Sequence, residues 1–180
     1  MRLQIADGDT QTRSRSLVGE PDAASYRIAV KRMDAGRGGS RHMWQRTTGD
    51  RPIVSEPHND FPLSFDPDAY LLIAGGIGVT PLVSMALALA KHAPRGHSRV
   101  RVCYGARSAK ELVYRGGLEA ALGECFALFA QEANQRIDFD AEIALLSTKA
   151  PVYCCGPAPM LDAFKAAWQT ARRPLQKPAL

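Results

Sequence analysis

The sequence lacks any apolar run near the roughly 20 residues that a membrane-spanning helix requires. Its longest apolar run, Pro81–Ala90, is interrupted by Ser84 and followed by Lys91. Residues 1–7 contain no apolar core of the kind that a secretory signal peptide carries. We therefore expect a protein of the cytoplasm that does not associate with membranes.

Cysteine is scarce, and the four cysteines are not spaced as metal ligands. No Cys-x-x-Cys pair occurs, and the run of three close thiolates used by a plant-type two-iron cluster is missing. Cys154 and Cys155 are adjacent, and successive strand residues point to opposite faces of a sheet. We predict no metal site and no iron–sulfur cluster in this chain, and we interpret Cys103 and Cys125 as buried thiols.

The sequence also lacks blocks of like charge. Its 23 Lys and Arg against 18 Asp and Glu give a net charge of +5, but no Lys/Arg block or aromatic ladder accompanies the basic residues. This pattern predicts no nucleic-acid binding. A mildly basic surface suits an anionic small molecule or an acidic protein partner. With 46% hydrophobic residues in 180, the chain can bury a sizeable core.

The order of the expected strands and helices changes after about residue 65, which predicts two domains, residues 1–65 and 66–180. The first contains β-type segments separated by Gly-rich turns, one of them at 36–40, and predicts part of a β-barrel. The second alternates strands with helices, which predicts a doubly wound parallel sheet, an α/β fold. The expected strands are 2–6, 26–32, 51–56, 70–74, 99–104, 125–130 and 152–155. The expected helices are 81–92, 110–122, 158–171 and a short one near 140–146.

The sharpest local pattern is an apolar strand that runs into the glycines of Gly75–Gly78 and then into a helix. Glycines allow a tight turn and the close approach of a phosphate, and a helix N-terminus binds anions. Thr80 is expected to cap this helix, with Pro81 at its first position. A plain tight turn without a ligand is the alternative interpretation.

Two further segments follow strands that would end at the same edge. Cys155-Gly156-Pro157 forms a second turn of small residues before a helix, and Arg107-Ser108 offers a guanidinium and a hydroxyl to a phosphate or ribose. A core thiol and a solvated arginine are the alternatives. In the first domain, Arg13–Leu17 and Arg37–Ser40 combine basic and hydroxyl groups, as a phosphate cradle does, although a flexible basic loop has the same composition.

Taken in order, these segments resemble the ferredoxin–NADP reductase superfamily, and within it the phthalate dioxygenase reductase and vanillate demethylase reductase group. The segments that carry the resemblance are Arg13–Leu17, Ile28–Arg32, Gly36–Ser40, Pro57–Leu63, Gly75–Pro81, Tyr104–Ser108 and Cys155–Pro157.

The resemblance implies a flavin on the barrel, FMN rather than FAD, and NADH rather than NADPH on the α/β domain. It also implies electron transfer to a separate ferredoxin-like or oxygenase component. The residues implied to hold the flavin are Arg13, Arg15, Ser16, Ala29, Val30, Lys31, Gly39 and Ser40. Those implied to line the dinucleotide are Gly76, Gly78, Arg107, Ser108, Cys155, Gly156 and Pro157. Two catalytic positions are implied, Thr80 near the flavin ring and Cys155 beside the nicotinamide, where it positions the hydride donor.

The chain departs from the group's pattern in three ways. Arg15 stands where the group has a tyrosine. The group's pattern also has about two more barrel strands before the point that matches Met1, and a last sheet strand and a ferredoxin domain after the point that matches Leu180. A fragment or a short member is therefore expected, and a non-catalytic dinucleotide-binding module is the alternative function. A classical dehydrogenase is disfavoured, because Gly105–Ser108 replaces the acidic residue expected after the second strand.

Overall fold

The computed structural model describes residues 1–7, 9–19, 22, 24–35, 37–92 and 99–173. The chain forms two compact units, Met1–Asn59 and Asp60–Leu180. Gly36, which belongs to one of the predicted turns, lies outside the described residues.

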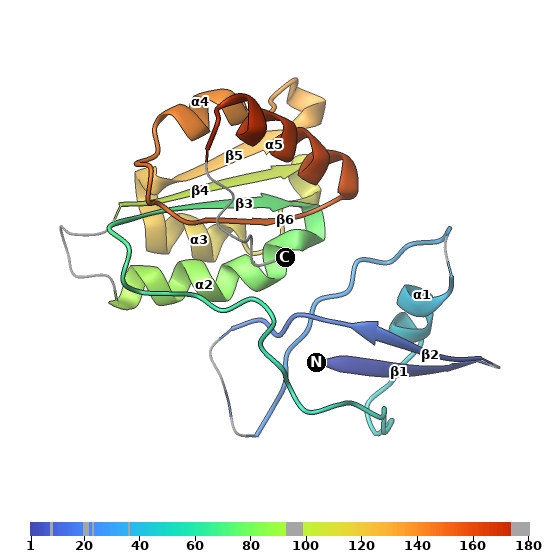
Figure 1. Cartoon of the computed structure of the whole chain (residues 1–180). Coiled ribbons are helices and arrows are strands. Elements are labelled where there is room, and N and C mark those ends of the chain that lie inside the picture. The colour runs from blue at the N-terminus through green and yellow to red at the C-terminus, as the bar shows by residue number, and fades with distance from the viewer. Residues whose placement is uncertain (8, 20–21, 23, 36, 93–98, 174–180) are drawn as a thin grey trace. The chain divides into compact units, whose positions relative to one another are not determined.

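The second unit is built on a four-stranded sheet in the order β5-β4-β3-β6 (Figure 1). All three strand pairs are parallel, as the alternation of strands and helices predicts. The strands are β3 (Ala69–Gly75), β4 (Arg99–Ala106), β5 (Phe126–Ala130) and β6 (Val152–Cys155).

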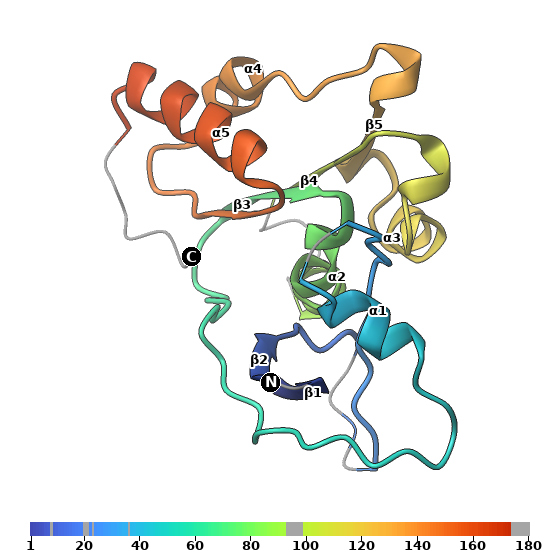
Figure 2. The ribbon, with the colours of Figure 1, turned by 90° about the vertical axis from the view of Figure 1, so that its right-hand side faces the viewer.

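Helices cover both faces of this sheet, which makes the fold doubly wound (Figures 1 and 2). The helices α2 (Val79–His92) and α3 (Arg115–Leu122) lie on one face. The helices α4 (Phe139–Ala144) and α5 (Ala158–Thr170) lie on the other. Four 3-10 turns connect the elements: η1 (Gly76–Gly78), η2 (Ala109–Glu111), η3 (Gly123–Cys125) and η4 (Gln131–Ala133).

The central strand β3 is buried on both faces, so its sequence reads as a continuous apolar run. Leu71, Leu72, Ile73 and Ala74 are all fully buried. Leu71 and Ile73 form a cluster with Cys103 of β4, and the partly buried residues packed against that cluster come from the side of α4 and α5. Successive residues alternate in direction, so Leu72 and Ala74 point towards the face that α2 and α3 cover.

One charged pair ties the sheet to a covering helix. Arg101 of β4 donates from Nε to Glu142 Oε2 at 3.0 Å and from Nη2 to Glu142 Oε1 at 2.7 Å. The Glu142 side chain is only 9% exposed, so its negative charge is stabilised by the two hydrogen bonds from Arg101 and little by water. The hydrogen bonds from Arg101 lower the pKa of Glu142, although burial acts in the opposite direction.

The buried thiol expected at Cys103 is confirmed, whereas the one expected at Cys125 is wrong. Burial, reinforced by the nearby Glu142 carboxylate, raises the pKa of Cys103 to about 12. Cys125 is exposed because it ends the surface turn η3 before β5 begins.

The single helix expected over 110–122 is also wrong. The chain forms η2, leaves the helical conformation at Leu112 and starts α3 only at Arg115, after Tyr114 in the left-handed region at φ 63°. The buried Tyr104 hydroxyl donates to the Glu111 carbonyl at 3.2 Å and so holds the end of η2. A tertiary hydrogen bond therefore overrides the helical sequence pattern.

The first unit contains one antiparallel hairpin, β1 (Arg2–Asp7) with β2 (Asp9–Ser14), and the short helix α1 (Gly39–Trp44). The turn expected at 36–40 is therefore wrong from Gly39 onward. Side-chain hydrogen bonds hold this short helix, from Trp44 Nε1 to the Val30 carbonyl and between Ser40 Oγ and both the N–H and the carbonyl of Met33. Sequence propensity does not reveal such contacts.

The strands expected at 26–32 and 51–56 do not form as strands. Within the described residues, 26–32 take part in one backbone–backbone hydrogen bond, from the Val18 N–H to the Arg27 carbonyl. In 51–56 the structure has an isolated bridge at Val54 and no strand. β propensity needs a neighbouring strand to become a ladder, and within the described residues neither segment has one. No helix in the described part of the chain is long and apolar enough to cross a membrane.

Replacing Glu142 by alanine should lower the free energy of unfolding by about 2 kcal/mol, because Arg101 keeps its charge without its buried partner. The folded-state pKa of Glu142 is lowered, so its stabilisation is present above the unfolded carboxyl pKa of about 4.3 and is lost as the pH falls further. Urea titrations at pH 7 and pH 3 measure both effects. The exposed Glu119→Ala serves as control, and an equal loss in both variants would contradict the assignment.

Candidate functional site

The candidate site lies at the carboxyl edge of the parallel sheet. Strand β3 is followed in order by β4 and β5 on one side, whereas β6 lies on its other side. The direction of winding therefore reverses between β3 and β6, and ligands of open α/β sheets bind beyond the strand ends at such a point. The two glycine turns singled out in the sequence, Gly75–Gly78 and Cys155–Pro157, follow these two strands.

The two turns pack backbone against backbone. A Cβ on Gly78 would overlap the carbonyl oxygen of Cys155 and lie 2.8 Å from the Gly156 Cα. A Cβ on Gly156 would lie 3.0 Å from the Gly75 Cα, and one on Gly75 would lie 2.6 Å from Met160 Sδ. Gly78 is therefore required by the backbone contact between the turns, whereas Gly75 and Gly156 also make room for the Met160 side chain. The sequence pattern does not reveal these reasons.

Gly76 differs from the other three glycines. It has φ 52°, in the left-handed region, and a Cβ there would meet no atom within 4 Å. Its conformation turns the chain from β3 into η1, and its open side leaves room next to the backbone.

Thr80 does not cap α2, so that prediction is wrong. The helix begins at Val79, directly after η1, and Thr80 lies inside its first turn. The buried hydroxyl of Thr80 donates to the Ile77 carbonyl at 3.1 Å and ties η1 to the helix. Pro81 is the third residue of the helix, so its predicted place at the first position is wrong as well. It still lies in the first turn, where its missing N–H leaves no hydrogen bond unmade.

The two adjacent thiols of β6 are held in the protonated form. Burial raises the pKa of Cys155 above its ordinary value and raises that of Cys154 to about 12. Cys155 lies at the end of the strand, half-buried and next to the glycine turn. A neutral thiol in this place fits a positioning role and does not fit a nucleophilic one.

Arg107 and Ser108 follow β4, the neighbour of β3 on the side away from β6. Arg107 is exposed and Ser108 is half-buried. Sequence reasoning missed a third participant, Glu132 of η4, which receives the Ala109 N–H on its Oε1 at 2.8 Å. Nothing in the sequence indicates this contact across 23 residues, because it depends on β4 and β5 being neighbours.

In the first unit, Arg13 and Arg15 are two residues apart in extended chain and so project to the same side. The Arg15 N–H bonds to the Met1 carbonyl and prolongs the hairpin beyond β2. Burial first and the nearby Arg13 second lower the pKa of Arg15. Arg15 therefore brings a second positive charge to this side of the chain, and the two guanidinium groups repel each other.

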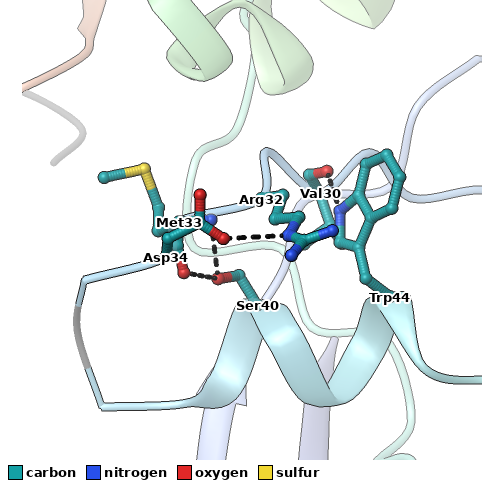
Figure 3. A network of polar contacts seen from close by, with 6 residues as sticks. All are labelled: Val30, Arg32, Met33, Asp34, Ser40 and Trp44. Atoms are coloured by element: carbon teal, nitrogen blue, oxygen red, sulfur yellow. Dashed lines mark hydrogen bonds and ion pairs between the residues drawn. The ribbon is translucent and has the colours of Figure 1, made fainter.

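Hydrogen bonds around α1 involve two of the other residues predicted to hold the flavin, Val30 and Ser40 (Figure 3). Ser40 Oγ accepts from the Met33 N–H at 3.0 Å and faces the Met33 carbonyl at 3.3 Å. The Val30 carbonyl accepts from Trp44 Nε1 at 3.0 Å. These bonds place Met33 next to Ser40 at the start of α1 and Val30 next to Trp44 at its end. No group of three or more His, Cys, Asp or Glu residues in the described ranges could hold a metal ion.

Comparison with known proteins is consistent with this geometry. Residues 72–166 match the family described as oxidoreductase NAD-binding domain. The carnitine monooxygenase reductase subunit of Escherichia coli (strain K12) is 32% identical over 170 residues, which cover 91% of this chain and 51% of that protein. The vanillate O-demethylase oxidoreductase of Pseudomonas putida is 32% identical over 170 residues, which cover 89% of this chain and 52% of that protein.

A solved structure of phthalate dioxygenase reductase, described as modular for electron transfer from pyridine nucleotides to [2Fe-2S], is similar along 98% of this chain. Its TM-score is 0.80 at 29% identity, and the match covers 55% of that chain. The resemblance read from the sequence motifs is thereby confirmed. The chain spans about half the length of the curated relatives it matches.

We predict that alanine at Gly78 lowers the free energy of unfolding by about 3 kcal/mol, because a backbone carbonyl cannot move aside as a side chain can. Alanine at Gly76 should cost about 1 kcal/mol, from its left-handed backbone alone. Gly117→Ala, in the open helix α3, is the control and should stabilise by roughly 0.5 kcal/mol or more. Urea denaturation measures all three. Equal effects at Gly76 and Gly78 would contradict the packing of the two turns.

Proposed function

Because the chain belongs to the oxidoreductase NAD-binding domain family, we propose that it is a flavin-dependent NADH reductase that passes electrons to an iron–sulfur protein of an oxygenase or demethylase system. The observation that carries the proposal is the contact between the two glycine turns at the reversal point of a parallel sheet. This contact builds a binding edge of the kind that dinucleotides use.

The dinucleotide is proposed to cross this edge with its pyrophosphate at η1 and the start of α2. Gly76 leaves its backbone open on that side, and the first N–H groups of a 14-residue helix favour an anion. The adenosine half then lies over β4, where Arg107 and Ser108 lie, and the nicotinamide half lies over β6. Gly78, Gly156 and Pro157 shape the backbone between the two halves.

Cys155 is proposed to lie beside the nicotinamide and to hold its ring in place. Its half-buried, protonated thiol offers a compact and uncharged surface there. Thr80 acts through its bond to the Ile77 carbonyl, which fixes η1 against α2. The further role implied for Thr80 near the flavin ring stays a prediction.

Residues 1–65 are proposed to hold the flavin, FMN in preference to FAD. Of the described donors, the Arg13 guanidinium suits a flavin phosphate, whereas Arg15, which Arg13 repels, takes the position that the group's pattern gives to a ring-facing tyrosine. The remaining residues proposed for this site are Ser16, Ala29, Val30, Lys31, Gly39 and Ser40. A bound flavin would accept a hydride and release its electrons one at a time.

The proposed electron acceptor is a separate ferredoxin-like or oxygenase component in the same cytoplasm. Relatives of this chain support this class of acceptor, because one is named as a monooxygenase reductase subunit and another as an O-demethylase oxidoreductase. The net charge of +5 would favour encounter with an acidic partner.

A second candidate function is a dinucleotide-binding module that holds no flavin. This candidate is favoured by an observation in the first unit: the segments at 26–32 and 51–56, which the sequence predicts as barrel strands, form no ladder in the described part of the chain. The visible absorption spectrum of the purified protein separates the two candidates, because only a bound flavin absorbs blue light.

We expect NADH to bind more tightly than NADPH. We also expect Arg107→Ala to weaken NADH binding by roughly tenfold, because the variant loses a charge-assisted hydrogen bond to the dinucleotide. Titration of each coenzyme, followed by nucleotide fluorescence, measures the dissociation constants. Arg136→Ala, which removes an exposed arginine beyond η4, is the control. Tighter binding of NADPH would overturn the coenzyme assignment, and binding of neither coenzyme would overturn the proposed function.

We expect Arg15→Tyr to increase the amount of flavin that copurifies with the protein. A tyrosine ring can stack on the flavin and removes the charge that Arg13 repels. Absorbance at the flavin bands, divided by protein concentration, gives the occupancy. Arg41→Tyr, on the exposed side of α1, is the matched control. Unchanged occupancy in Arg15→Tyr would place Arg15 away from the flavin.

A further inference from the structure

The loop after β4 is held at both ends by residues distant in sequence. Its far end is fixed by the Tyr104 hydroxyl, which donates to the Glu111 carbonyl at 3.2 Å. Its near end, Arg107–Ala109, continues from the β4–β5 ladder, whose last pair joins Ala106 and Ala130. The conformation of this loop therefore depends on groups outside it.

Glu132 binds the two peptide groups that flank Ser108. Its backbone N–H donates to the Arg107 carbonyl at 2.9 Å, and its carboxylate Oε1 accepts from the Ala109 N–H at 2.8 Å. Ser108 precedes η2 in extended conformation but makes no capping hydrogen bond with its side chain. The Glu132 carboxylate thus accepts the Ala109 N–H at the start of η2, a hydrogen bond that the side chain of a capping residue such as Ser108 would otherwise make.

The position of Glu132 is itself fixed by the turn around it. The Gln135 N–H donates to the Ala130 carbonyl at 3.1 Å, and the Gln135 Oε1 accepts from the Ala130 N–H at 3.3 Å. Asn134 adopts the left-handed conformation at φ 56° and donates its N–H to the Gln131 carbonyl. The backbone of Glu132 is therefore fixed, and from this fixed position its carboxylate reaches Ala109 in the loop after β4.

From this geometry we propose that Glu132 is a positioning residue for the adenosine half of the dinucleotide. By holding the peptides on both sides of Ser108, it sets the direction in which Arg107 and Ser108 meet the ligand. The proposal rests on the proposed function, because it requires a dinucleotide over β4. If Glu132 has this role, the affinity for the adenosine half depends on a residue of η4, the turn that follows β5.

The test compares ligands that contain different halves of the dinucleotide. ADP-ribose lacks the nicotinamide, and reduced nicotinamide mononucleotide lacks the adenosine. In Glu132→Ala the backbone bond to Arg107 remains, so the fold is retained, but the Ala109 N–H loses its acceptor. We expect the dissociation constants of NADH and ADP-ribose to rise roughly fivefold, as the loss of one exposed hydrogen bond allows. That of reduced nicotinamide mononucleotide should stay unchanged.

Two variants complete the experiment. Glu132→Gln keeps an acceptor oxygen and should bind ADP-ribose within about twofold of the wild type. Glu119→Ala removes an exposed carboxylate of α3 and should change none of the constants. Wild-type affinity for ADP-ribose in Glu132→Ala, an equal loss for both half-ligands, or an equal loss in Glu132→Gln would overturn the positioning role. A wild-type chain that binds neither NADH nor ADP-ribose would overturn the proposed function instead.

Discussion

Close packing of two turns at the carboxyl edge of the sheet is the constraint on which the rest of the second unit depends. Gly78 lies so near the Cys155 carbonyl that no side chain fits between them, and a Cβ on Gly156 would lie 3.0 Å from the Gly75 Cα. This contact sets how β6 leaves the sheet and where α2 and α5 begin. The proposed pyrophosphate and nicotinamide positions are both defined by these helix and strand ends, so the site and the fold share one requirement.

Charged groups hold the outer parts of this framework. The Arg101–Glu142 pair joins β4 to α4 on one face of the sheet, and Glu132 joins the turns after β4 and β5 at the edge. Arg173 adds a third link, since it donates to the carbonyls of Ile143, Leu146 and Ser147 at the end of α4. Each of the three is a hydrogen-bonded charge outside β3, so the apolar packing of that strand is left undisturbed.

The sequence predicted the α/β half well because each signal there is local. The apolar run of β3, the glycines after it and the proline at the start of α2 indicate strand, turn and helix without reference to distant residues. The first unit was predicted less well, since Tyr26–Arg32 has the composition of a strand but forms no ladder. The short helix Gly39–Trp44 was missed because hydrogen bonds from Ser40 and Trp44 to the chain around Val30–Met33 hold it.

By itself, then, the sequence determined the parallel α/β fold, the two glycine turns and the family resemblance, all of which depend on residue type and short spacing. Only the tertiary structure decided that Gly75, Gly78 and Gly156 serve a backbone contact, that Thr80 lies inside α2, and that Glu132 reaches Ala109. These facts depend on which strands are neighbours. Neighbouring strands bring together residues that are far apart in the chain, and no local pattern records such proximity.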